Sequence, residues 1–301
     1  MPRKANVITT CFNEELIRGS SMEQNLQRAL NMLDSFSSLQ PDLICFPEVF
    51  LLSGNDNNNE SSKEMTKLTY QALSVQAKKL NSYIIASVHE WIDSKKYIVA
   101  WLFDRNGNLA GRYCKYYPTD GEMKRDGITP GKEMPVFETD FGKIGIAICY
   151  DIGYPEIWSR LSAMGAELVV WLSAYDGGFP LEAYAWLHAY YVISSVRSNH
   201  SKMIDKTGKV MASTSKWAGW SSKTIDLDKQ IFHIDNQYDK LLEVQGCLGR
   251  KVTIESFSQE NIFTIESNDK EWPMERIVSE FKLESYREYH VRSEKAQNES
   301  R

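Results

Sequence analysis

Short apolar runs alternate with helical patterns along most of this 301-residue chain. Several runs rich in Val, Ile, Phe, Tyr and Trp are bounded by turn-forming residues, as is typical of β-strands. These predicted strands cover residues 6–12, 43–50, 83–91, 97–104, 143–150, 167–174 and 261–267. Because helical patterns separate several of the strands, the chain is predicted to adopt an α/β fold whose helices cover sheet faces.

Helical periodicity is clearest in three stretches. Apolar positions 26, 30, 33 and 36 share one face of the first, and positions 65, 68, 72 and 75 share one face of the second. The third helix is expected to hold Pro155 in its first turn, where a missing N–H costs little, and to turn Ile157, Leu161 and Met164 inward. Residues 181–196 are apolar nearly all round and predict a buried helix that runs into a strand.

The turn sequence DRNGN, Asp104–Asn108, predicts a hairpin between two strands. A hairpin joins antiparallel strands, so we expect a mixed sheet. Residues 53–62 are polar and are expected to form an exposed loop. We expect one domain over residues 1–270. A charged tail over residues 271–301 is expected to lie at an oligomer interface or to be partly disordered.

Composition narrows the function classes. The net charge of −5 and the pI near 5.7 give no reason to expect nucleic acid or an anionic membrane as a partner. The sequence has no run of the roughly 20 apolar residues that a membrane helix needs, and its start lacks the apolar run of a signal peptide. The five cysteines form no CxxC pair and the five histidines show no ligand spacing. We therefore expect a cytoplasmic protein without disulfides, metal or cofactor.

Three reactive side chains stand at the ends of predicted strands, beside turn-forming residues. Glu48 ends the segment FPE, Lys115 ends GRYCK, and Cys149 begins CYDIGYPE. Each has an ordinary structural explanation when taken alone. The glutamate could turn into water, the lysine could reach solvent from an edge strand, and the cysteine could be a small core residue.

Together the three residues favour nucleophilic catalysis. A cysteine nucleophile needs a base, and a desolvated glutamate can serve because desolvation raises its basicity. A nearby lysine would stabilise the thiolate and the oxyanion, and a second carboxylate, Glu122, could hold that lysine and position the substrate nitrogen. The helix start that follows Cys149 is expected to lower the thiol pKa and to offer backbone N–H groups to an oxyanion.

The same three segments resemble the motifs of the nitrilase, or carbon–nitrogen hydrolase, superfamily, in the same order. The resemblance covers roughly residues 5 to 270. It implies a four-layer α-β-β-α sandwich with mixed sheets, assembled as a homodimer or a larger homo-oligomer. It also implies a metal-free hydrolysis that passes through a thioester.

Carried over to this sequence, the resemblance makes Cys149 the nucleophile and Glu48 the general base. It makes Lys115 the group that stabilises the tetrahedral intermediate, helped by the backbone N–H of Tyr150. Glu122 matches an additional glutamate that many members place shortly after the lysine.

The substrate is less well defined by the resemblance. Asp151, two residues after the cysteine, is typical of amidase and carbamoyl-hydrolase branches. The branch that acts on N-carbamoyl-D-amino acids carries arginines where this chain has Ile152 and Gly153. A carboxylate-bearing substrate would need another cation, for which Arg197 is our candidate, and Tyr175 lies in a segment that lines the pocket of relatives.

The sequence therefore predicts an amidohydrolase that cleaves a small amide or an N-carbamoyl (ureido) compound and releases ammonia. A nitrilase that converts a nitrile to a carboxylic acid would use the same residues. A catalytically silent binding or scaffold member of the family is the non-enzymatic alternative. The physiological substrate, the choice between hydrolysis and acyl transfer, and the size of the oligomer stay open.

Overall fold

The computed structural model describes residues 3–55 and 62–301, so most of the expected polar loop at residues 53–62 lies outside the described residues. Contacts divide the chain into two compact units, a larger one of residues 5–225 and a smaller one of residues 1–4 and 226–301. This division falls at a different place from the expected boundary after residue 270. The expected role of residues 271–301 at an oligomer interface stays a prediction.

Helices and strands alternate along the larger unit, as the apolar pattern predicts. The helices of the chain are α1 (Met22–Ser35), α2 (Lys63–Leu80), α3 (Asp120–Lys124), α4 (Pro155–Ala163), α5 (Phe179–His188), α6 (Tyr238–Leu248), α7 (Met274–Glu280) and α8 (Tyr286–Ser300). The strands of the first sheet are β1 (Lys4–Thr10), β2 (Leu43–Cys45), β3 (Tyr83–Ile92), β4 (Lys95–Phe103), β5 (Leu109–Cys114) and β12 (Trp220–Asp226). Those of the second are β6 (Val136–Glu138), β7 (Lys143–Ile148), β8 (Leu168–Ser173), β9 (Tyr191–Val196), β10 (Lys202–Ile204) and β11 (Val210–Ser213). The remaining strands are β13 (Gln230–His233), β14 (Val252–Phe257) and β15 (Ile262–Ser267).

Both large sheets are mixed. The first has the strand order β12-β1-β2-β3-β4-β5, and the second has the order β11-β10-β9-β8-β7-β6. Strands β1, β2 and β3 pair in parallel, whereas β3, β4 and β5 pair antiparallel. The predicted hairpin at Asp104–Asn108 joins β4 to β5. In the second sheet β7, β8 and β9 are parallel, so their carboxyl ends meet at one edge.

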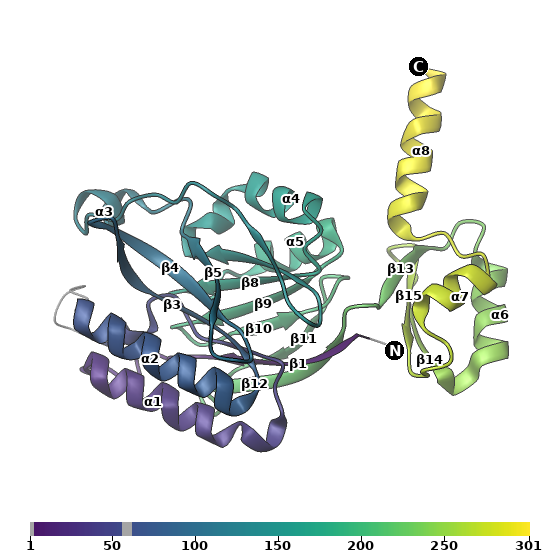
Figure 1. Cartoon of the computed structure of the whole chain (residues 1–301). Coiled ribbons are helices and arrows are strands. Elements are labelled where there is room, and N and C mark those ends of the chain that lie inside the picture. Colours follow the sequence, from purple (N-terminus) through teal and green to yellow (C-terminus); the bar gives the residue numbers. More distant parts are fainter. Residues whose placement is uncertain (1–2, 56–61) are drawn as a thin grey trace. The chain divides into compact units, whose positions relative to one another are not determined.

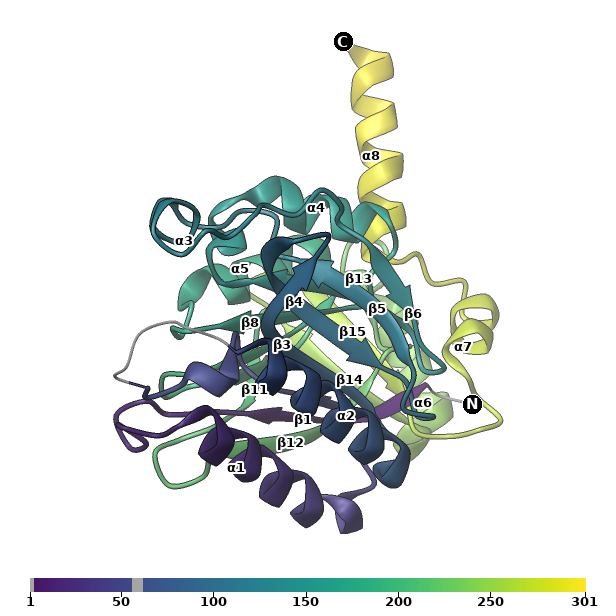
Figure 2. The ribbon, with the colours of Figure 1, turned by 60° about the vertical axis from the view of Figure 1, so that its left-hand side comes forward.

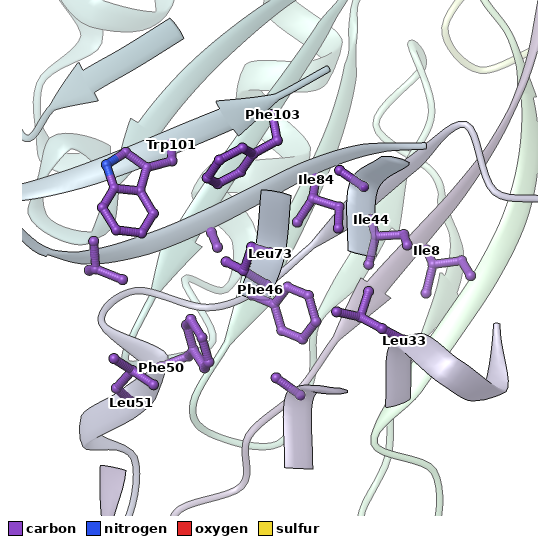
Figure 3. Close-up of a cluster of buried hydrophobic side chains, with 14 of the residues drawn as sticks. Ile8, Leu33, Ile44, Phe46, Phe50, Leu51, Leu73, Ile84, Trp101 and Phe103 are labelled. Atoms are coloured by element: carbon purple, nitrogen blue, oxygen red, sulfur yellow. The ribbon is translucent and has the colours of Figure 1, made fainter. Parts of the chain in front are cut away.

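Helices cover the outer face of each sheet, which gives the four layers of an α-β-β-α sandwich (Figures 1 and 2). Leu33 of α1 and Leu73 of α2 pack with strand residues such as Trp101 in the first core (Figure 3). On the second sheet the core includes residues of α4 and α5 packed on β7, β8 and β9. The two sheets meet face to face, where the Thr9 hydroxyl donates to the Ser194 carbonyl at 2.6 Å.

Helix α2 turns inward a face that matches the predicted one only in part. Met65 is buried as predicted, but the other buried positions include Thr66 and Leu73, whereas Val75 is 65% exposed. Thr66 can be buried because its hydroxyl donates to the carbonyl of His89 at 3.0 Å. A count of apolar residues misses a threonine whose hydroxyl is satisfied in this way.

Two further expectations about helices are corrected. Met164 is 44% exposed, because α4 ends at Ala163, before that position turns inward. The predicted buried helix is α5, which does run into β9, but only Leu181 and Ala185 are buried while Leu187 is 67% exposed. Helix α5 is therefore apolar on most sides but is buried on only one of them.

The smaller unit has its own hydrophobic core. Its antiparallel sheet has the order β13-β15-β14, and Phe232, Phe263 and Ile277 pack in the core with residues of α6 and α7. Helix α8 has no buried residue. Within the described residues of the whole chain, no helix combines the length and apolar character that spanning a bilayer requires.

Candidate active site

The residues singled out from the sequence follow strands at the ends where the chain leaves a sheet. Glu48 lies three residues after β2, and Lys115 directly follows β5. Cys149 directly follows β7 and opens a 3₁₀ turn, Cys149–Gly153. Strands β2 and β7 are paired on both sides and β5 is paired with β4, so the positions just beyond these strands are held by the sheets.

Lys115 joins two carboxylates in the interior. Its Nζ donates to Glu48 Oε1 at 2.8 Å and to Glu122 Oε1 and Oε2 at 2.8 Å and 2.9 Å. Lys115 is 1% exposed and Glu48 is 3% exposed. Burial disfavours the ammonium, but the charges of Glu48 and Glu122 outweigh it and raise the pKa of Lys115 above its ordinary value. The lysine therefore stays charged at neutral pH.

Glu122 is held at the start of a short helix. The Thr119 N–H donates to Glu122 Oε2 at 2.7 Å, and the Glu122 N–H donates to Thr119 Oγ1 at 3.2 Å. This reciprocal pair is a capping box, which fixes the glutamate side chain while its oxygens face Lys115. The Thr-x-x-Glu spacing is visible in the sequence and could have predicted this capping box.

Cys149 occupies a strained backbone position. Its φ of 47° lies in the left-handed region, which a residue with a Cβ adopts at a cost. The Trp171 Nε1–H donates to the Cys149 carbonyl at 3.1 Å and so holds this conformation from β8. Strain maintained by neighbouring bonds is a common feature of residues that present a reactive group.

The thiol of Cys149 is protonated in the resting state. Burial and the Glu48 carboxylate raise its pKa to about 12, against the opposing effects of Lys115 and of a hydrogen bond with Ser173. The expectation that the helix start lowers this pKa is therefore wrong, because burial and a neighbouring anion outweigh it. A hydrogen bond to Glu48 also favours the protonated thiol, which places a proton acceptor beside the nucleophile.

Asp151 connects the cysteine turn to the lysine segment, a role that the sequence reasoning missed. It accepts bonds from the Tyr113 hydroxyl at 2.6 Å, from the Ile148 N–H at 2.8 Å and from the Tyr117 N–H at 2.9 Å. Burial raises its pKa to about 6, although these three bonds favour the ionised form. Tyr113 and Tyr117 flank the lysine on the chain, so a single buried carboxylate aligns the two segments.

The other predicted residues lie around the same edge. Tyr150 is the second residue of the 3₁₀ turn, where backbone N–H groups have no acceptor within the turn. Tyr175 is 44% exposed, and burial together with the charges of Cys149 and Glu48 raises its pKa to about 12. Arg197 directly follows β9, and its Nη1 lies 3.3 Å from Glu14 Oε1.

Metal chemistry has no ready site in the part of the chain that the structure describes. Among those residues, no group of three or more His, Cys, Asp or Glu side chains could hold an ion. What the arrangement offers is a thiol, an adjacent carboxylate and a buried ammonium. These groups can carry out nucleophilic attack, proton transfer and stabilisation of an oxyanion.

The family model and the related sequences agree on one protein family. The sequence model of the family described as Carbon-nitrogen hydrolase matches residues 17–230. A Schizosaccharomyces pombe protein named as a probable nitrilase is 30% identical over 234 residues, which cover 69% of this chain and 84% of that protein. The deaminated glutathione amidase of Synechocystis is 27% identical over 241 residues, covering 69% of this chain and 88% of the relative.

Solved structures show the same fold. The amidase from Nesterenkonia sp. superposes with a TM-score of 0.66 at 18% identity, covering 74% of this chain and 91% of that one. Saccharomyces cerevisiae Nit3, of branch 10 of the nitrilase superfamily, gives a TM-score of 0.63 at 21% identity, with coverage of 74% and 90%. A variant of the Nesterenkonia amidase, at a TM-score of 0.65 and 18% identity over 74% of this chain and 90% of that one, carries an acetamide moiety added covalently at its active-site cysteine. The family match spans well over half of the chain, and the chain belongs to the carbon–nitrogen hydrolase family of the nitrilase superfamily.

Proposed function

We propose that this protein is an amidase that hydrolyses a small amide or N-carbamoyl compound through a thioester on Cys149. The observation that carries the proposal is the contact between Lys115 and the carboxylates of Glu48 and Glu122, beside a thiol that is hydrogen-bonded to Glu48. The amidase names among the relatives, and the adduct on the cysteine of one of them, support the same chemistry.

Acylation follows from the geometry of these groups. Glu48 takes the thiol proton as the Cys149 sulfur attacks the carbonyl carbon, because the resting thiol is protonated and Glu48 lies beside it. Lys115 and the Tyr150 N–H stabilise the oxyanion that forms. The carbon–nitrogen bond then breaks, Glu48 passes its proton to the leaving nitrogen, and ammonia departs to leave the thioester.

Deacylation uses the same groups, with a water molecule as the nucleophile and the thiolate as the leaving group. Glu48 removes a proton from a water molecule, which attacks the thioester carbon. The carbon–sulfur bond breaks, the thiol recovers its proton and the carboxylic acid leaves. Glu122 keeps Lys115 in position in both steps through its two hydrogen bonds. An N-carbamoyl substrate follows the same route and also releases carbon dioxide, because its acid product is a carbamate.

A nitrile is the second candidate substrate, favoured by the nitrilase name of one relative. The same thiol would add to the nitrile carbon, and hydrolysis would again end in an acid and ammonia. A silent binding member is less well supported, because the four candidate catalytic residues are present and brought together. The cytoplasmic location and the homo-oligomeric state expected from the sequence remain part of this proposal.

The test is a substrate panel assayed for ammonia and carbon dioxide with the wild type and with Cys149→Ala. We expect the wild type to release ammonia from amides or ureido compounds and the variant to release none while keeping its circular dichroism spectrum. Cys45→Ala is the matched control, because Cys45 is a buried free cysteine in β2. Turnover by a folded Cys149→Ala protein would refute the proposal, and turnover of nitriles alone would replace amidase by nitrilase.

A further inference from the structure

Strand β8 contacts the candidate nucleophile at two points. Ile148 of β7 pairs with Leu172 of β8 in a parallel register. Cys149 and Ser173 each lie one residue further along, so they are neighbours at the ends of the two strands. The Trp171 indole binds the Cys149 carbonyl, and the Ser173 hydroxyl forms a hydrogen bond with the Cys149 thiol. Strand β8 therefore holds both the backbone and the sulfur of the cysteine.

Ser173 is itself buried and held in place by backbone contacts. It is 0% exposed, its Oγ accepts the Tyr175 N–H at 3.1 Å, and its carbonyl accepts the Arg197 N–H at 3.0 Å. A hydrogen bond to a charged group is stronger in such an interior than in water, because solvent neither competes with it nor screens it. The hydroxyl is therefore oriented before any reaction begins and needs no rearrangement to bind the sulfur.

The direction of the hydrogen bond between Ser173 and Cys149 follows from the neighbouring contacts. The thiol hydrogen is shared with Glu48, because that hydrogen bond favours the protonated thiol. The Ser173 oxygen accepts from the Tyr175 N–H, and its single hydrogen is left to donate to the sulfur. This donation lowers the pKa of the thiol, against the larger opposing effects of burial and Glu48.

A donor on the sulfur acts at two points of the reaction. In acylation, Glu48 removes the thiol proton and negative charge develops on the sulfur as it attacks. In deacylation, the carbon–sulfur bond breaks and its electron pair returns to the sulfur. The sulfur is a thiolate at both points, and Ser173 stabilises it without giving up its own proton. The neutral sulfur of the thioester is a weaker acceptor, so this hydrogen bond is strongest where it can accelerate the reaction.

We propose that Ser173 is a further catalytic residue, whose hydroxyl stabilises the Cys149 thiolate as it forms for attack and as it leaves the thioester. The inference rests on the proposed function and adds a residue to it. Lys115 attracts the same thiolate through its charge, whereas Ser173 contributes a directed hydrogen bond from the neighbouring strand.

The test compares Ser173→Ala with the wild type in two assays. Alkylation of Cys149 by iodoacetamide, followed by peptide mass mapping, needs no substrate. The variant should react about threefold more slowly, because its thiol pKa is higher and its thiolate fraction smaller, an effect that the greater nucleophilicity of a more basic thiolate offsets only in part. With an amide substrate, kcat and kcat/KM should fall together by about 10- to 100-fold, because a hydrogen bond to a charged group is lost in the transition state.

A second pair of variants separates the hydroxyl from packing. Ser173→Thr and Ser173→Val add the same bulk at this position, but only Ser173→Thr keeps a hydroxyl. We expect kcat of Ser173→Thr to exceed that of Ser173→Val by about tenfold, which is the loss of one such hydrogen bond. Ser87→Ala is the matched control and should behave as the wild type, because Ser87 is a buried serine of β3 whose hydroxyl has no partner among the described residues.

The two assays keep this inference apart from the proposed function. Wild-type alkylation and turnover rates in a Ser173→Ala protein with an unchanged circular dichroism spectrum would overturn the inference while leaving the amidase intact. Equal kcat values for Ser173→Thr and Ser173→Val would also overturn it. A wild type that turns over no amide would refute the proposed function, whereas the alkylation rates would still decide whether Ser173 stabilises the thiolate.

Discussion

Replacing Lys115 by methionine should destabilise the protein as well as inactivate it. The substitution keeps a long apolar side chain but removes the ammonium from between Glu48 and Glu122. Glu48 is 3% exposed and would keep a buried charge without its cation. Removing one partner of a buried ion pair typically costs about 3–5 kcal/mol, so we expect the free energy of unfolding to fall by that amount.

Urea-induced unfolding followed by tryptophan fluorescence measures this loss. Adding Glu48→Gln to Lys115→Met should recover stability by about 2 kcal/mol, because the double variant no longer buries the unpaired charge. Lys124→Met removes an exposed lysine of α3 whose side chain is 77% accessible, and it should leave the unfolding curve unchanged. A Lys115→Met protein as stable as the wild type would refute the claim that Lys115 offsets the buried carboxylate, and so would a double variant with no recovery.

Two further predictions concern the cysteine turn. Because burial and Glu48 raise the pKa of Cys149 to about 12, alkylation of this thiol by iodoacetamide should accelerate about tenfold per pH unit between pH 7 and pH 10. Peptide mass mapping measures the alkylation rate of Cys149 and, for comparison, that of the exposed Cys247. A Cys149 rate that is flat from pH 6 to pH 8 would contradict the raised pKa. Tyr113→Phe removes a donor that lowers the pKa of Asp151, which is about 6, so ionisation of Asp151 should need a higher pH. If ionised Asp151 aligns the turn, the acid limb of kcat should lie near pH 6 and move upward in Tyr113→Phe; an unmoved limb would count against that role.

The grouping of the candidate catalytic residues could be anticipated because these residues are adjacent to regular elements. Glu48 and Cys149 lie near the ends of strands that the apolar pattern predicts, and Lys115 follows the strand that comes after the predicted hairpin turn. Strand ends bring such distant segments to one edge. The sequence order of the motifs and the alternating pattern were sufficient for the fold class. The pairing of Lys115 with Glu122 could be anticipated from charge alone, although its geometry depends on a capping box.

Other features depend on long-range contacts that no local pattern reveals. The bond between Asp151 and Tyr113 joins residues 38 positions apart. The raised pKa of Cys149 depends on burial and on Glu48, whereas local reasoning considered only the helix start. Thr66 occupies the inner face of α2 because a carbonyl of β3 accepts its hydroxyl, which periodicity cannot foresee.

The central claim is that a thioester forms on Cys149 during turnover. The direct test is mass spectrometry of the wild-type protein, quenched in acid on the millisecond to second scale after mixing with an excess of an amide that it hydrolyses. An acyl group should be present on the enzyme during turnover, and peptide mapping should place the added mass on the peptide that contains Cys149. Cys149→Ala under the same conditions should show no added mass. An acyl group on another cysteine, or ammonia release by a protein whose Cys149 peptide carries no added mass at any time during turnover, would contradict the account.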